Sequence, residues 1–192
     1  MTIRFICCSL QTAGRLREWL NHPHRQCIVP TNWAHPSPPC MAVRSSRIKY
    51  LLDSGAVVIC DRYAFSGIAF SASKALLQKA SHSTSSPLTY EWCRAPDVSL
   101  PAPDLTLFLD ISPEQAAEQR EGYGDERYEK LEMQARVREV FGRIGKEMGT
   151  EKWVTIDAGR TREEVEKDIW EKVSPLVDGV KEPVSRLWGD LL

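Results

Sequence analysis

Apolar and polar positions fall into blocks that predict a sheet covered by helices. Three short runs are rich in β-branched and aromatic residues, as strands of a buried parallel sheet are: residues 56–60, 105–110 and 152–159. Stretches with helical spacing lie between and around these runs, at residues 47–55, 63–80, 112–120, 128–148 and 161–177. This alternation predicts an α/β fold with a doubly wound parallel sheet and helices on both faces.

Residues typical of helix ends support these boundaries. Gly55 closes the first helix. Ser112 is an expected N-cap with Pro113 at the first helical position, and Thr161 and Glu164 form an expected capping box.

Residues 1–44 lack this regularity. Residues 21–40 hold five prolines and follow a period of neither 2 nor 3.6, so we expect no packed helix or central strand there. Residues 12–20 could form one short helix, and the Ser-rich stretch 81–87 is typical of a mobile loop. We therefore expect an atypical N-terminal segment, 1–44, for which disorder is one interpretation, and one α/β domain, 45–192.

The composition says more about which kinds of partner the chain could bind than about its fold. The chain has 192 residues, 42% hydrophobic and 27% charged, as in one ordinary globular domain. A formal net charge of −1 gives no basic field, which argues against nucleic acid or an anionic membrane as partner. The first ten residues show no cleavage signal and too short an apolar run to cross a bilayer, so we expect neither a secretory signal nor a membrane span.

The cysteines are irregularly spaced in a chain too large to need a disulfide framework. Reduced thiols in a cytoplasmic or nuclear protein are the better interpretation of Cys7, Cys8, Cys27, Cys40, Cys60 and Cys93.

Three carboxylates fall at the ends of the expected strands: Asp61, Asp110 and Asp157. Ligands of open α/β sheets bind at the carboxyl ends of the strands. Arg62 follows Asp61, so a carboxylate and a guanidinium could project together into the crevice above the sheet. The alternative is equally open: Asp61 caps the next helix and Arg62 pairs on the surface.

A second charged segment, residues 120–130, joins two expected helices. It contains two glycines, two tyrosines and alternating charges, and it could be a solvated loop. A phosphate-transferring enzyme, however, needs a hinged, arginine-bearing flap that excludes water and neutralises charge on the moving phosphoryl group. Arg120 and Arg127 could supply that charge, and Gly122 and Gly124 the hinge.

Four segments occur in the order found in eukaryotic-type thymidylate kinases, and together they resemble that family over about residues 47–188. The segments are VVICDRYAFSGIAFSASK, TYEWCRAPDVSLPAPDLTLFLD, EGYGDERYE and TIDAGRTREEV. The combination of DRY-x-x-SG, a W-C…D…LP-x-PD strand and an ERYE lid is highly specific.

The resemblance implies a P-loop kinase-like fold and transfer of the γ-phosphoryl group of Mg-ATP to dTMP, giving dTDP for dTTP biosynthesis. It implies that Asp61 lies near Mg²⁺ and the phosphates and that Arg62 grips the dTMP phosphate in a bidentate fork. The family is commonly dimeric, which implies a homodimer. The resemblance further implies a nucleoside wall of Ser66, Gly67 and Phe70, a lid with Arg120, Arg127 and Tyr128, the last near deoxyribose and thymine, and an adenine loop of Asp157, Ala158, Gly159 and Arg160.

The sequence departs from the family in its first 44 residues. The phosphate cradle G-x-x-x-x-G-K-[ST] is absent, and the nearest string, residues 142–148, has the wrong spacing and lies in an expected helix. The family's F-S-A-N-R-W-like helix is replaced by PPCMAVRSS, where Arg44 or Arg47 could substitute in charge but no Phe is near. We therefore expect the first strand and phosphate loop to be missing.

Other interpretations of residues 1–44 stay open. A shifted reading frame, a wrong exon or a wrong start codon would produce such a segment. Arg15, in residues 12–20, could be a remnant of a phosphate-contacting residue. An unstructured loop is favoured over a zinc cluster, because common finger spacings do not fit His22, His24, His35, Cys27 and Cys40.

Two further hypotheses compete with an active kinase. One is a non-catalytic nucleotide-binding paralogue that keeps Arg62 and Tyr128 without turnover. The other is a truncated product without a stable fold, because a parallel sheet that lacks its central strand exposes two edges.

Trp92, Trp153 and Trp170 are expected in the core.

Overall fold

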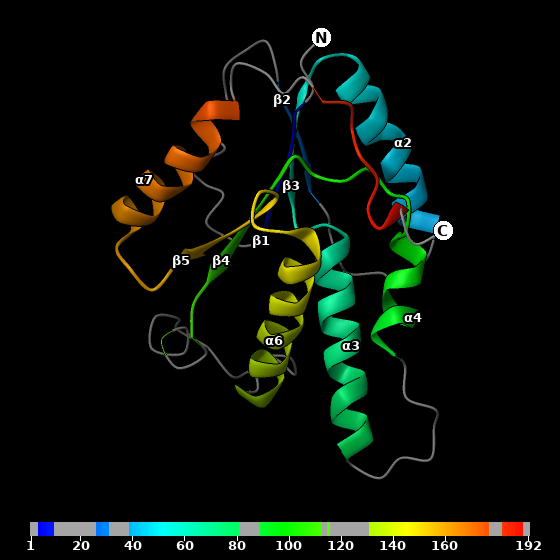
Figure 1. Ribbon diagram of the computed structural model, residues 1–192, viewed down its shortest axis with the longest axis vertical. Coiled ribbons are helices and arrows are strands. Elements are labelled where there is room, and N and C mark those ends of the chain that lie inside the picture. Colours follow the sequence, from blue (N-terminus) through cyan, green and yellow to red (C-terminus); the bar gives the residue numbers. More distant parts are fainter. Residues whose placement is uncertain are drawn as a thin grey trace.

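In the computed structural model, the described residues form one five-stranded parallel sheet with helices around it (Figure 1). The model describes residues 4–9, 26–30, 39–80, 89–112, 115, 131–176 and 182–189. The strand order is β2-β3-β1-β4-β5. The strands are β1 (Arg4–Ser9), β2 (Gln26–Pro30), β3 (Val57–Asp61), β4 (Leu105–Asp110) and β5 (Trp153–Asp157).

The helices follow the predicted alternation. The described ones are α2 (Pro39–Asp53), α3 (Ala64–Ala80), α4 (Tyr90–Arg94), α6 (Leu131–Met148) and α7 (Arg162–Val173), with short 3₁₀ turns η1 (Ala95–Asp97) and η2 (Ser174–Leu176). The three predicted strands and the capping box of α7 are confirmed, and so are the predicted helices that fall in the described residues. The predicted segments 12–20, 81–87 and most of 112–130 lie outside these residues, although the Gln115 N–H donates to Ser112 Oγ at 3.2 Å, as an N-cap requires.

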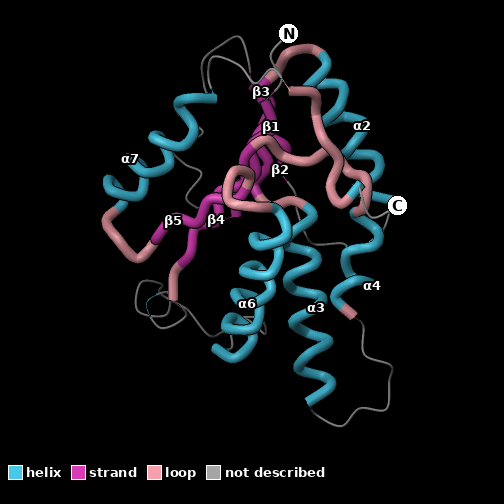
Figure 2. The backbone as a smooth tube through the Cα atoms, viewed as in Figure 1, coloured by secondary structure: helices cyan, strands magenta, loops and turns pink. Residues whose placement is uncertain are grey.

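Both faces of the sheet are buried, as a parallel sheet requires (Figure 2). Val58 and Cys60 of β3 point to one face, where they meet buried side chains of α2, α3, α4 and α6. Ile59 and alternate residues of β4 and β5 point to the other face and pack against α7. Cys60 and Cys93 are buried thiols. Among the described residues, no helix is long and apolar enough to cross a membrane.

The prediction that the first strand is missing is wrong. β1 lies at the centre of the sheet and pairs in parallel with β3 on one side and β4 on the other. Its apolar run, Phe5 to Cys8, has the composition of a strand covered on both faces. The proline-rich residues 21–40 that follow are instead typical of irregular chain. The chain that follows β1, where a phosphate loop would lie, is outside the described residues.

The two prolines of the N-terminal segment that the structure describes occupy positions that tolerate them. Pro30 ends β2, an edge strand, where its missing N–H costs no ladder bond to a further strand. Pro39 begins α2, eight residues before the predicted start of the helix at residue 47. The division of the chain into 1–44 and 45–192 stays a prediction, although β1 and β2 pair with a strand of the second part.

An aromatic cluster joins α3 and α6 to the sheet. The Trp153 ring lies 5.3 Å from the Phe65 ring and 5.8 Å from the Phe108 ring, centroid to centroid. Trp153 is buried as predicted, whereas Trp92 and Trp170 are 61% and 43% exposed, so their predicted core positions are wrong. Each lies on a helix whose other side faces the core, a distinction that residue type alone does not make.

Gly145 lets α6 approach Trp153. A Cβ on Gly145 would lie 2.7 Å from Trp153 Nε1, whereas a Cβ on Gly142 of the same helix would have nothing within 4 Å. The glycine-containing string 142–148 therefore belongs to a packed helix, as the sequence indicated, and it is not a phosphate loop.

We expect Gly145→Ala to lower the free energy of unfolding by about 1–3 kcal/mol, because the rigid indole must move. Gly142→Ala is the matched control and should raise it by up to about 1 kcal/mol through helix propensity. Urea denaturation of the two variants measures both values. Equal stability would show that α6 does not pack on Trp153 as described.

Residues 182–189 pair through backbone hydrogen bonds with the turn that precedes β4. The Leu187 N–H donates to Leu100 O at 2.9 Å and the Ser99 N–H to Leu187 O at 2.8 Å. Leu187 and Trp188 are buried in the main core. In this region burial raises the pKa of the Asp97 carboxyl from its ordinary value of 3.8 to about 7.

Asp97 should make the fold less stable as the pH rises. Its raised pKa contributes stability that is fully present below about pH 4 and is lost as the pH passes about 7. Asp97→Asn should remove this dependence and exceed the wild type at pH 8 by about 2–4 kcal/mol. Denaturation at pH 4.5 and pH 8 tests it; the same difference between the proteins at both pH values would contradict the assignment.

Candidate functional site

The carboxyl ends of the strands gather three acidic residues at one edge of the sheet. Asp61, Asp110 and Asp157 are the last residues of β3, β4 and β5. Asp110 and Asp157 are direct register partners, and Asp61 is aligned with Cys8 of the central strand. The prediction that these carboxylates lie at the carboxyl ends of parallel strands is confirmed. Open α/β sheets bind their ligands at these ends. The side chain of Asp61 lies outside the described residues.

Arg62 sits in a left-handed backbone conformation between β3 and α3. Its φ is 61°, a region that side chains with a Cβ enter at a cost. The next residue, Tyr63, is buried and its hydroxyl donates to Pro101 O at 3.2 Å, which anchors the turn. Strained backbone that the surrounding structure enforces is typical of functional sites.

The first turns of α3 carry the predicted wall residues. Ser66 is buried, and its N–H donates to Tyr63 O at 3.3 Å. Phe70 is half-buried and packs against the main core, one turn along from Gly67. Their position on the helix that begins just after Arg62 puts them beside the sheet edge.

The turn from β5 to α7 is held by its own side chains. The Gly159 N–H donates to Asp157 Oδ1 at 2.9 Å, and the Ala158 N–H donates to Asp110 O at 2.8 Å. Arg160 pairs with Asp157, Nε to Oδ2, at 3.6 Å and also donates from its NH2 to Asp168 Oδ2 on α7. The hydrogen bond with Asp168 raises the pKa of Arg160.

Arg138 of α6 reaches the same edge and was not foreseen. Its Nε and NH2 donate to the two Asp110 carboxylate oxygens, both at 2.7 Å, in a bidentate pair. The partners are 28 residues apart, and Arg138 lies in none of the four quoted segments, so no sequence signal joins them. Both carboxylate oxygens of Asp110 are therefore paired with the Arg138 guanidinium.

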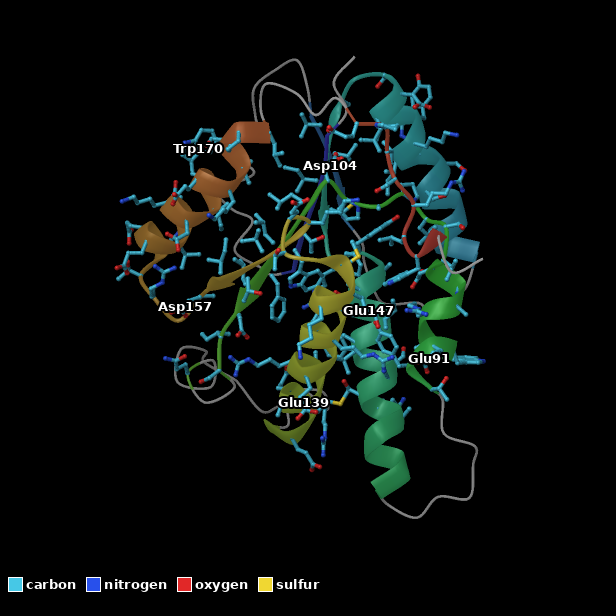
Figure 3. All side chains as sticks on the ribbon, viewed as in Figure 1. Glu91, Asp104, Glu139, Glu147, Asp157 and Trp170 are labelled. Atoms are coloured by element: carbon cyan, nitrogen blue, oxygen red, sulfur yellow. The ribbon has the colours of Figure 1, made fainter. Side chains whose placement is uncertain are left out.

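A second charged cluster lies between α4 and α6, away from Asp157 and the β5 edge (Figure 3). Glu147 accepts from the Tyr90 hydroxyl at 2.9 Å, from Arg94 at 3.1 Å and from Arg143 at 3.3 Å. The Arg143 guanidinium also lies 3.6 Å from the Tyr90 ring centroid. Burial raises the pKa of Tyr90, and the bonds of Glu147 to Tyr90 and Arg94 fasten α4 to α6, so this cluster is structural.

The predicted lid residues, Arg120, Arg127 and Tyr128, lie outside the described residues. Among the described residues, no group of three or more His, Cys, Asp or Glu side chains could hold a metal ion. The edge thus offers Arg62 and the β5–α7 turn, together with the unforeseen Arg138, Gln115 and Asp168.

Comparison with known proteins gives consistent matches. The family model described as thymidylate kinase matches residues 41–169. Thymidylate kinase of Arabidopsis thaliana is 43% identical over 150 residues, 76% of this chain and 49% of its own length. That of Schizosaccharomyces pombe is 44% identical over 138 residues, 69% of this chain and 60% of its own. The chain thus spans about half to three fifths of the curated relatives it matches.

A solved structure of thymidylate kinase from Candida albicans is similar over the whole fold. The TM-score is 0.78 at 24% sequence identity, over 97% of this chain and 98% of the other. The similarity establishes the architecture.

The strain at Arg62 can be measured with two substitutions that both remove the guanidinium. Arg62→Gly should be about 1 kcal/mol more stable to unfolding than Arg62→Ala, because only alanine keeps a Cβ at a φ of 61°. Thermal or urea unfolding of the pair measures the difference. If the alanine variant were the more stable, the left-handed turn would not exist in solution.

Proposed function

The chain belongs to the thymidylate kinase family, and from this premise we propose that it binds dTMP and takes part in transfer of the γ-phosphoryl group of Mg-ATP to it, giving dTDP. The observation that carries the proposal is the turn at residues 61–67, which combines the family's DRY-x-x-SG sequence with a strained backbone at the sheet edge. A cytoplasmic or nuclear location and a homodimer remain part of the proposal.

In the proposed acceptor site, Arg62 binds the dTMP phosphate. A guanidinium matches a phosphate bidentately, and a backbone fixed by Tyr63 aims it before the ligand arrives. Ser66, Gly67 and Phe70 border the nucleoside. Arg120, Arg127 and Tyr128 form the lid that neutralises the transferred group and excludes water.

In the proposed donor site, Asp157, Ala158, Gly159 and Arg160 lie against the adenine. Mg²⁺ enters with ATP, near Asp61. The residues present do not fit a complete phosphate and metal site, because the sequence has no G-x-x-x-x-G-K-[ST] cradle and the described residues offer no cluster of three ligands. We propose that the chain as it stands is an impaired kinase.

The alternatives now differ in weight. A missing central strand would make the chain an unstable fragment, but β1 fills that position. A non-catalytic nucleotide-binding paralogue stays in contention, because Arg62 is retained without the cradle. A cooperative melt that dTMP shifts upward, with no turnover, would favour the paralogue over the fragment.

The chain should give background ADP release with dTMP and ATP in a coupled assay. Loss of one preorganised donor from such a site costs about 10²-fold or more in rate, and here a nest of backbone N–H groups, a lysine and a hydroxyl are absent together. Replacing residues 1–44 with a family N-terminus that carries the cradle should restore dTMP-dependent turnover.

Two results would contradict the proposal. Robust activity of the unmodified chain would show that residues 1–44 build a phosphate site by another route. A restored chain that folds, binds ATP and shows no dTMP-dependent turnover would remove dTMP kinase activity as the function.

A further inference from the structure

Arg160 is the best-held cation of the β5–α7 turn. One side of its guanidinium donates to Asp168 on α7, and its Nε pairs with Asp157 at the end of β5 at 3.6 Å. The Arg160 side chain nevertheless keeps 36% of its surface exposed. The guanidinium is planar and its edge N–H groups are paired, so its exposed part is a flat face toward solvent.

The backbone beneath this guanidinium is fixed as well. Thr161 and Glu164 form a full capping box: the Glu164 N–H donates to Thr161 Oγ1 at 3.4 Å, and the Thr161 N–H donates to Glu164 Oε2 at 3.0 Å. The absence of a side chain on Gly159 lets Gln115 and Asp157 approach closely, since a Cβ there would lie 3.0 Å from Gln115 Oε1 and 3.2 Å from Asp157 Oδ1. The turn therefore holds one conformation without a ligand.

The charges around Arg160 decide which part of a nucleotide it suits. Two carboxylates, Asp157 and Asp168, face one guanidinium, so the group as a whole carries a net negative charge. A phosphate would meet repulsion from both carboxylates, whereas an uncharged aromatic ring would not. A guanidinium whose edges are already paired still attracts a ring placed over its face.

We propose that Asp168 is a positioning residue that holds Arg160 flat and neutralised, so that Arg160 contacts the base of the donor nucleotide and not its phosphates. The inference rests on the proposed function for its assignment of a donor site to this turn. It adds that selectivity for the base depends on a carboxylate of α7 that itself touches no nucleotide.

The test uses the full chain and two probes that separate base from phosphate. Adenosine carries the base without phosphates, and inorganic tripolyphosphate carries the phosphates without a base. NMR titrations, followed at the Gly159 amide and the Arg160 Nε–H, give a dissociation constant for each probe. The variants are Asp168→Asn and Arg160→Leu, and the matched control is Glu171→Gln, which removes a negative charge from an exposed position of the same helix.

Asp168→Asn should move the two probes in opposite directions. Adenosine should bind about threefold to fivefold more weakly, because the guanidinium is no longer held flat. Tripolyphosphate should bind about twofold more tightly than to Glu171→Gln, because Arg160 gains charge that Asp168 had neutralised. Arg160→Leu should weaken adenosine binding without the gain for tripolyphosphate.

Several outcomes overturn the proposal. If adenosine shifts neither signal of the wild type, Arg160 does not contact a base. If Asp168→Asn changes both dissociation constants in the same direction, Asp168 has only a structural or a long-range electrostatic role. Turnover by the chain with a restored N-terminus reports on the proposed function separately, so an active restored chain with an unaltered Asp168→Asn response overturns this inference alone.

Discussion

Parallel strands need cover on both faces, because each crossover lays a helix on the sheet and leaves no face for water. In this chain α2, α3, α4 and α6 bury one face and α7 buries the other. The aromatic contacts of Trp153 with Phe65 of α3 and Phe141 of α6 fix how these two helices meet the sheet. This arrangement brings the carboxyl ends of all five described strands to one edge, and every candidate site residue that the structure describes lies at or just beyond that edge.

The two sides of the molecule use charge differently. Between α4 and α6, Glu147 joins Tyr90, Arg94 and Arg143 in a partly buried cluster that fastens one helix to another. At the sheet edge, by contrast, Arg138 and Arg160 pair with carboxylates that remain partly exposed, and Arg62 sits in a costly backbone conformation. Exposed pairs of this kind contribute little stability.

This chain keeps the parallel sheet of the family fold, whereas its sequence lacks the family's phosphate-cradle motif. β1 occupies the central position of the sheet, which satisfies the ladder bonds of β3 and β4, although its sequence differs from the family's. A strand needs only apolar residues that pack on both faces, whereas a phosphate cradle needs particular residues at fixed spacing. Residues 1–44 meet the first requirement in part and lack the second motif, which is why we propose impaired chemistry on a retained architecture.

The sequence by itself determined the alternation of strands and helices, the capping box of α7 and the acidic residues at the strand ends, because these depend on local periodicity and short-range hydrogen bonds. It also carried the family, through segments such as DRY-x-x-SG. Only the tertiary structure decided that residues 4–9 are the central strand, that Gly145 makes room for Trp153, and that Arg138 and Asp168 hold Asp110 and Arg160. These features depend on contacts between distant or separately folded elements, and no local pattern records which neighbour a side chain will meet.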